Sequence, residues 1–259
     1  MKFAIQHNLM NAAQLRQVDG ATAKYPRVFV GCIPFSHEIT CEEPLDGVNY
    51  IPYGSTLFTS IAAERKWKGL HLDLSTMNYR AWCENRDDML NSGTMPVRDA
   101  VEFLRQNPDS RWFTRPSADL KQYSGYVGDA NSIADHFESM MGAVGGGSYY
   151  MPPDAEVVLS EPQEILAEWR WFIVDRKIVS GSMYRAHGQL RLMEELEPAV
   201  VKQAQRFADK WLPHDCVVMD LAYTVDDVKV IEFNCINASG FYRNDIPAVF
   251  RELYRYHTK

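Results

Sequence analysis

The stretch VVMDLAYTVDDVKVIEFNCINASG, residues 217–240, consists of two apolar segments separated by a polar turn. This pattern predicts a β-hairpin. Three oxygen-bearing side chains interrupt the apolar segments: Asp220, Glu232 and Asn234. A turn near Asp226–Asp227 brings position 220 back toward position 232, and residues 232 and 234 share one face of their strand. We therefore expect the three side chains to converge.

Two carboxylates and an amide in one place favour a bound cation. Neighbouring carboxylates repel each other unless a cation lies between them. Hard oxygen ligands suit Mg²⁺, which binds one or two carboxylates together with the phosphates of a substrate. A strand face with ordinary solvent-exposed acids explains the same pattern, and the hairpin alone does not separate the two interpretations.

A magnesium ion held in this way usually binds a phosphate group of the substrate. The negative charge of that phosphate in turn favours basic side chains nearby. Arg115 precedes a proline in FTRP, residues 113–116, which favours extended backbone and places the arginine at the end of a strand. Lys121 follows in a turn with Ser124 and Gly125, where backbone N–H groups could approach an anion. The signal is weaker than a Walker P-loop, which the sequence lacks.

The stretch EWRWFIVDRKIVSGSMYR, residues 168–185, predicts a second hairpin with Asp-Arg-Lys at its turn. Arg170 and Arg185 lie on its two strands, and we expect them nearly opposite each other. Like charges directly opposite destabilise a sheet, and a bound anion would relieve that repulsion. Two arginines that extend into water are the alternative.

Composition limits the classes of partner. The chain has 259 residues and a net charge of -7, which argues against a general nucleic-acid or membrane binder. Its apolar runs are too short to cross a bilayer, and its start lacks a secretory segment. Five cysteines without a CxxC pair argue against a zinc site or a disulfide framework and fit a reducing compartment. We expect a cytoplasmic protein.

The order of predicted elements divides the chain into two parts. Residues 1–94 alternate short strands and helices, including a strand over 69–74, and predict a small α/β domain. The second part, residues 95–259, opens with a helix at Pro96 and ends with an amphipathic helix, the hairpin described first and a final helix.

These motifs resemble the ATP-grasp superfamily, in which two α+β subdomains fold around ATP and Mg²⁺, behind a small α/β domain. The resemblance covers about residues 96–259 and is nearest to a phage and bacterial subgroup marked by paired arginines and a lysine. It implies a ligase that joins a carboxylate to an amine through an acyl-phosphate and releases ADP and phosphate. The implied partners are small-molecule or peptide acids and amines, with Mn²⁺ as an alternative to Mg²⁺.

The resemblance also assigns roles to individual residues. The metal ligands become Asp220, Glu232 and Asn234. The nucleotide contacts become Glu161 for adenine, Glu168 for ribose, and Arg115, Lys121 and Arg170 for the phosphates. The catalytic groups become Arg170, Arg185 and Lys121, with an arginine stabilising the tetrahedral oxyanion.

The sequence departs from the family in three places, and the first is the predicted phosphate loop, residues 121–125, which has fewer glycines than is usual. Arginine replaces the usual lysine at Arg115, which changes the geometry on phosphate. Val218 stands where an arginine is common, and the hairpin arginines are the expected substitutes. Two other functions stay open: a phosphotransferase, and a non-catalytic ATP-binding regulatory module. The sequence does not identify the substrates or the oligomeric state.

Overall fold

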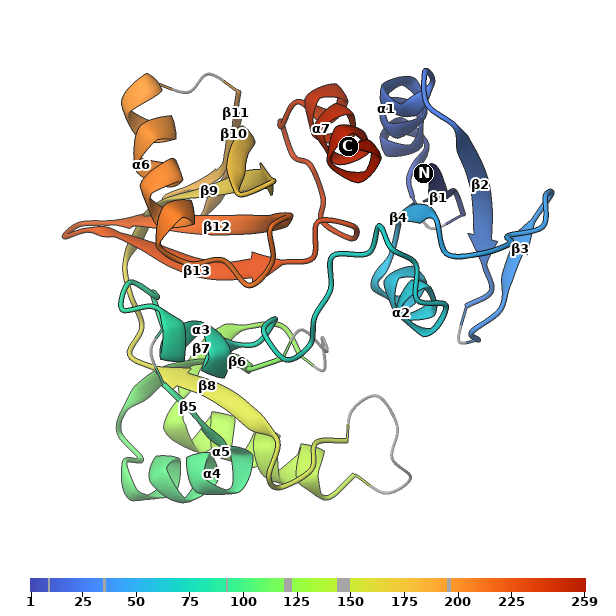
Figure 1. The fold of residues 1–259 in the computed structure, drawn as a ribbon. Coiled ribbons are helices and arrows are strands. Elements are labelled where there is room, and N and C mark those ends of the chain that lie inside the picture. The colour runs from blue at the N-terminus through green and yellow to red at the C-terminus, as the bar shows by residue number, and fades with distance from the viewer. Residues whose placement is uncertain (9, 35, 92, 119–122, 144–149, 195–196) are drawn as a thin grey trace. The chain divides into compact units, whose positions relative to one another are not determined.

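The structure is a computed structural model of the chain and describes residues 1–8, 10–34, 36–91, 93–118, 123–143, 150–194 and 197–259 (Figure 1). This described part contains seven helices and three sheets, which confirms the predicted α+β class.

Contacts between Cα atoms divide the chain into two compact units. Unit 1 contains residues 1–73, 167–221 and 233–259, and unit 2 contains residues 74–166 and 222–232. The boundary expected near residue 94 lies inside unit 2. The units therefore divide the chain differently from the expected domains 1–94 and 95–259, which stay a prediction.

The first sheet of unit 1 is built from the N-terminal residues and has the order β3-β2-β1-β4. Its strands are β1 (Lys2–Gln6), β2 (Arg27–Cys32), β3 (Ile39–Cys41) and β4 (Tyr50–Tyr53). Strand β1 pairs in parallel with β2 and β4, and β3 is antiparallel to β2. The accompanying helices are α1 (Ala12–Thr22) and α2 (Thr56–Glu64). The parallel pairing agrees with the predicted βαβ-like order.

The strand predicted over residues 69–74 is wrong, because this segment forms turns and irregular backbone. Its backbone groups bond to other partners. Gly69 N donates to Tyr50 O at 2.9 Å, and Gly69 O accepts from Asn237 Nδ2 at 3.0 Å. His71 N donates to Asn237 Oδ1 at 2.8 Å. A buried amide side chain from a distant loop thus replaces the ladder of a strand.

A five-stranded sheet with the order β11-β10-β9-β12-β13 carries the two predicted hairpins. Its strands are β9 (Ile165–Val174), β10 (Lys177–Ala186), β11 (Gln189–Met193), β12 (Val217–Thr224) and β13 (Val228–Asn234). Helix α6 (Pro198–Lys210) packs against β10. The neighbouring positions of β12 and β13 confirm the hairpin predicted for residues 217–240.

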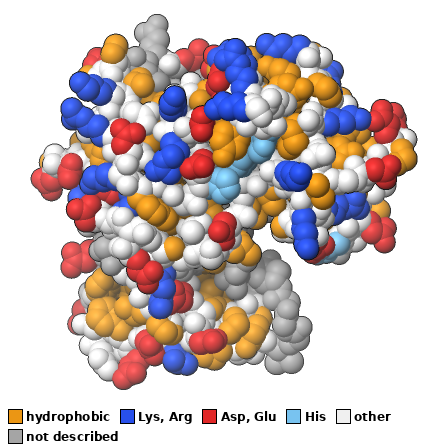
Figure 2. Space-filling model, in the orientation of Figure 1, with side chains coloured by type: hydrophobic (Ala, Val, Ile, Leu, Met, Phe, Trp, Pro, Cys, Tyr) orange, Lys and Arg blue, Asp and Glu red, His pale blue; other side chains and the backbone are white. Residues whose placement is uncertain are grey.

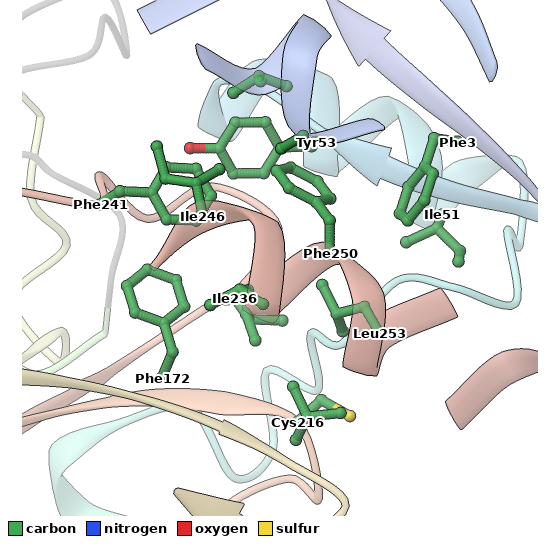
Figure 3. Close-up of a cluster of buried hydrophobic side chains, with 14 of the residues drawn as sticks. Phe3, Ile51, Tyr53, Phe172, Cys216, Ile236, Phe241, Ile246, Phe250 and Leu253 are labelled. Atoms are coloured by element: carbon green, nitrogen blue, oxygen red, sulfur yellow. The ribbon is translucent and has the colours of Figure 1, made fainter. Parts of the chain in front are cut away.

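Aromatic side chains from distant segments form the core of unit 1 (Figure 3). Helix α7 (Ile246–Thr258) supplies Phe250, whose ring centroid lies 5.2 Å from that of Phe3 and 5.3 Å from that of Tyr53, both edge to face. Phe241 lies 5.0 Å from Phe172 in a stacked pair. The core therefore fastens the C-terminal helix to strands β1 and β4.

Truncating the central ring of this core should be costly. Phe250→Ala should lower the free energy of unfolding by about 3–5 kcal/mol, because the buried ring leaves a cavity. Leu190→Ala, at a side chain that is exposed, is the matched control and should change stability by less than about 0.5 kcal/mol. Urea unfolding followed by tryptophan fluorescence measures both, and equal effects would contradict the assigned core.

Unit 2 contains an antiparallel sheet with the order β5-β8-β6-β7. Its strands are β5 (Thr94–Pro96), β6 (Arg111–Pro116), β7 (Tyr126–Asp129) and β8 (Glu156–Ser160). Helices α4 (Val97–Gln106) and α5 (Ala130–Met141) pack on each other and share an apolar core with the sheet. A short helix, α3 (Tyr79–Asn85), also belongs to unit 2.

Candidate functional site

The candidate metal ligand Asp220 is held by Arg170 on the neighbouring strand of the sheet. Arg170 Nε donates to Asp220 Oδ1 at 2.9 Å, and Nη2 donates to Oδ2 at 2.7 Å. Asp220 is only 1 % exposed. Arg170 Nη1 also donates to Gly240 O at 3.2 Å, in the loop after β13. This fork-to-fork geometry fixes both charges and keeps the buried carboxylate neutralised.

Asn234 lies in the same place as Asp220. Its Nδ2 is 3.4 Å from Asp220 Oδ2, so the structure brings two of the three predicted metal ligands together within unit 1. Glu232 is two residues earlier on β13 and belongs to unit 2.

The third predicted ligand, Glu232, forms an ion pair with Arg115 within unit 2. Arg115 Nη1 donates to Glu232 Oε2 in a close contact, and both side chains are mostly buried. The Arg115 guanidinium lies 5.0 Å from the ring centroid of Tyr79, a cation–π contact. The predicted phosphate ligand and a predicted metal ligand are therefore direct partners.

Tyr79 supports this ion pair from helix α3. Its hydroxyl donates to Ile231 O in a close contact and accepts from Asn91 Nδ2 at 3.3 Å. Burial raises the pKa of Tyr79 to about 12, although the charge of Arg115 lowers it. The tyrosine thus stays a neutral donor. Sequence reasoning missed it because the polar stretch around α3 has no periodic pattern.

The second predicted arginine, Arg185, pairs with Glu168. Arg185 Nη1 donates to Glu168 Oε1 at 3.0 Å, and Tyr184 Oη donates to Glu168 Oε2 at 2.7 Å. The Glu168 carboxylate raises the pKa of Arg185. The Arg185 side chain is 50 % exposed, whereas that of Glu168 is buried. Arg185 therefore presents a fixed guanidinium to solvent.

The prediction that Arg170 and Arg185 lie opposite each other is wrong. Arg170 is paired with Ser182, and Arg185 with Glu168. The register of β9 and β10 shifts at two irregularities, and both turn residues have positive φ angles, 54° at Asp175 and 62° at Arg176. The two arginines therefore do not repel each other in the way that a bound anion was expected to relieve, because each arginine is paired with its own carboxylate.

Two stacked tyrosines stand beside Arg170. The rings of Tyr184 and Tyr242 are 4.6 Å apart and nearly parallel, and the Arg170 guanidinium lies 4.9 Å from the Tyr242 ring centroid. Burial is the main cause that raises the pKa of both tyrosines, so both stay neutral. Tyr242 has a left-handed backbone, with φ 50°, outside any hairpin turn. No sequence pattern marks this residue.

Two predicted nucleotide contacts receive less support. Glu161 follows β8, and its side chain is exposed. Lys121 lies outside the described residues, so its predicted phosphate and catalytic roles stay predictions.

Further features bear on the expected partners. No group of three or more His, Cys, Asp or Glu side chains suited to a metal ion occurs in the described segments. None of the helices in the described part of the chain has the length and apolar character needed to cross a bilayer. On the face shown in Figure 2, Lys and Arg side chains are interspersed with Asp and Glu.

The fold is that of the ATP-grasp proteins. Solved structures with this fold match nearly the whole chain: the RimK domain ATP-grasp protein of Sphaerobacter thermophilus DSM 20745 has 12% identity and a TM-score of 0.60, with 92% of each chain covered. D-alanine–D-alanine ligase of Bacillus anthracis has 10% identity and a TM-score of 0.59, covering 99% of this chain and 98% of its own. The ligase PsnB, complexed with a phosphomimetic variant of its minimal precursor, Mg and ADP, has 10% identity and a TM-score of 0.57, with 99% and 97% covered.

Sequence comparison identifies the family to which the chain belongs within that fold. The profile of the family described as "ATP-grasp domain, R2K clade family 3" matches residues 82–253, about two thirds of the chain. The protein therefore belongs to this family, which confirms the resemblance drawn from the motifs. No curated protein matches the sequence.

Proposed function

We propose that the protein is an ATP- and Mg²⁺-dependent ligase that joins a carboxylate to an amine through an acyl-phosphate. The observation that carries the proposal is that each candidate metal carboxylate is paired with an arginine: Asp220 with Arg170, and Glu232 with Arg115. A ligand that contains magnesium and phosphate needs a negative and a positive protein group, because the carboxylate binds the cation and the guanidinium binds the phosphate. Family membership supports the same interpretation.

The donor atoms suit magnesium, with manganese as the alternative. The ligand atoms on offer are the carboxylate oxygens of Asp220 and Glu232 and the amide oxygen of Asn234. The side chains of Asp220 and Asn234 are already in contact. Magnesium bound by these residues would neutralise phosphate charge. Arg170 would keep the Asp220 carboxylate oriented, because it grips both of its oxygens.

The remaining nucleotide contacts follow the predicted assignment. Arg115 would bind phosphate through the guanidinium that now meets Glu232, and Lys121 is proposed for the same role. Glu168 is proposed for the ribose hydroxyls and Glu161 for the adenine edge. Because Tyr184 and Arg185 hold both oxygens of Glu168, a ribose hydroxyl would share or replace one of these donors.

In the proposed reaction a carboxylate oxygen of the substrate attacks the γ-phosphorus of ATP, and ADP leaves. The amine then attacks the acyl carbon, and the tetrahedral oxyanion collapses with release of phosphate, which takes up the proton that the amine nitrogen loses. Arg185 is the better candidate to stabilise that oxyanion, because its guanidinium is half exposed while Arg170 is engaged with Asp220. Arg170 is proposed to contact the phosphates while it holds Asp220 in position.

Small molecules and peptides are the proposed substrate classes. The ligases with similar folds support both, since one is a D-alanine–D-alanine ligase and another is complexed with a precursor peptide. The experiment is to incubate the protein with ATP, Mg²⁺ and pooled amino acids, peptides and cell extract, and to measure ADP and new masses. ADP with an amide product is expected. A phosphorylated product would show that the protein is a phosphotransferase and not a ligase. ATP that binds without turnover would indicate a non-catalytic binding module.

A further inference from the structure

Three histidines from distant segments of unit 1 form a continuous chain of contacts. His71 follows Gly69, His214 precedes β12, and His257 lies in the last turn of α7. His71 Nδ1 is 3.2 Å from His214 Nδ1, and His71 Nε2 is 2.9 Å from His257 Nε2. Both ring nitrogens of His71 are thus used for different partners, so the rings do not converge on one metal ion. We call these residues the histidine chain.

A backbone donor fixes the direction of the hydrogen bonds. Cys216 N donates to His214 Nδ1 at 3.3 Å, so that nitrogen accepts and carries no proton. His71 Nδ1 must then donate to His214. In a neutral ring the Nε2 of His71 accepts, and His257 Nε2 completes the chain as its donor. The tautomers of all three neutral imidazoles follow from this one contact.

The histidine chain supports the loop after β13 through Asn237. The backbone N–H of His71 donates to Asn237 Oδ1 at 2.8 Å. Asn237 Nδ2 donates to Pro52 O at 2.7 Å and to Gly69 O at 3.0 Å, and the side chain is buried. Asn237 lies three residues after the candidate metal ligand Asn234. A shift of His71 would therefore loosen the loop that continues from the candidate metal strand.

The surroundings keep the histidine chain neutral. Burial is the largest cause that lowers the pKa of each imidazole, to about 4 for His257 and well below its usual value for His71. The pKa of His214 is also lowered by burial, although Asp215 and Asp73 raise it. The titratable and charged groups that face the chain are Asp73, Asp215, Tyr256, Cys216 and the amino group of Met1.

We propose that the histidine chain is a proton-linked support for Asn237, which holds the loop after β13 while the imidazoles are neutral and releases it in mild acid. His71 is in this sense a positioning residue, since it acts through Asn237. The inference is drawn from hydrogen bonds within unit 1 and does not depend on the ligase function.

The direction of the pH effect follows from linkage. An imidazole whose pKa is lowered by folding is neutral in the closed chain and gains a proton on release. Stabilisation is therefore fully present above the usual histidine pKa of about 6.5 and is lost as the pH falls through that value toward the folded pKa. For His257 alone, with a folded pKa of about 4, the opening equilibrium rises about 20-fold between pH 7 and pH 5.

Nuclear magnetic resonance on the whole protein tests the proposal in two ways. Long-range proton–nitrogen spectra at pH 7.5 should show Nδ1–H for His71 and Nε2–H for His214 and His257. The hydrogen-exchange protection of the Asn237 side-chain amide should fall about 20-fold or more from pH 7 to pH 5. The Asn91 amide is the internal control, because it is buried, lies in unit 2 outside the loop after β13, and is bonded to Tyr79 and Ser160, not to a histidine. Other tautomers, or equal behaviour of the two amides, would overturn the proposal.

A conservative double variant separates hydrogen bonding from titration. His214→Asn keeps an acceptor at the position of Nδ1, and His257→Gln keeps a donor at the position of Nε2, while neither new side chain titrates. The variant should fold at pH 7 and lose most of the acid-induced drop in Asn237 protection. Retention of the full drop, or failure to fold at pH 7, would contradict the assigned donors and acceptors. Neither outcome bears on ATP turnover, so the ligase proposal is tested separately.

Discussion

Glu232→Gln should abolish ATP turnover and leave the fold intact. Glutamine keeps the size of the side chain and can still accept a hydrogen bond from Arg115, which Glu232 contacts directly. It loses the negative charge that a magnesium ligand supplies. Mutations of outer-shell partners alone cost 10–100-fold in metal affinity or activity, so the loss of a ligand should lower turnover by at least about 100-fold.

The matched control for this change is Glu156→Gln. Glu156 also forms an ion pair with an arginine of unit 2, Arg80, but has no role in the proposed site. ADP release measured with a coupled assay should be unchanged in the control, and circular dichroism should show both variants folded. Turnover by Glu232→Gln at the wild-type rate would show that the metal assignment is wrong.

Arg170→Ala should destabilise the protein far more than Arg185→Ala. Removing Arg170 leaves the Asp220 carboxylate, which is almost fully buried, without its bidentate partner. An uncompensated buried charge of this kind costs about 3–5 kcal/mol. Arg185 is half exposed, so its pair with Glu168 should contribute no more than about 1 kcal/mol.

The two arginines should differ in catalysis as well. Arg185→Ala should lower turnover by about 10²–10³-fold, the effect of removing one preorganised oxyanion donor, with little change in adenosine affinity. Urea unfolding gives the stability of each variant, and the double variant Arg170→Met, Asp220→Asn should recover much of the stability lost in Arg170→Ala. Equal destabilisation by the two single alanine variants would contradict the distinct environments seen for the two arginines.

Local patterns in the sequence predicted the elements that carry the candidate site. Alternating apolar residues and short polar turns marked both hairpins, because a strand repeats every second residue. Spacing around Asp220 and Asn234 correctly anticipated that they meet, since a hairpin relates distant positions in a simple way. The family followed from the same residues.

The expected pairing of Arg170 with Arg185 failed because of the position of the turn. The turn at Asp175 and Arg176 pairs Val174 with Lys177, which alone would put Arg170 opposite Gly181, and the two irregularities between β9 and β10 then shift Arg170 to Ser182 and Arg185 to Glu168. The expected strand over residues 69–74 failed for a different reason. Its backbone bonds to Asn237, which is more than 160 residues away in the chain.

The histidine chain and the support of Arg115 by Tyr79 were also invisible in the sequence. His71, His214 and His257 stand in three unrelated segments without a shared motif, and only tertiary packing joins them. Tyr79 lies in a polar stretch that reads as a loop. Contacts of this type depend on which distant segments of the chain meet in the fold. The periodicity of the sequence does not encode that information.

Asp220, Glu232 and Asn234 are proposed to bind the divalent cation of the nucleotide. Manganese can replace magnesium and broadens the resonances of nearby nuclei, so a titration of MnATP into the ¹⁵N-labelled protein locates the cation. The side-chain amide of Asn234 should broaden first, and MgATP should cause no broadening. An Asn234 amide that stays sharp while other resonances broaden would place the cation elsewhere and show that the proposed metal site is wrong.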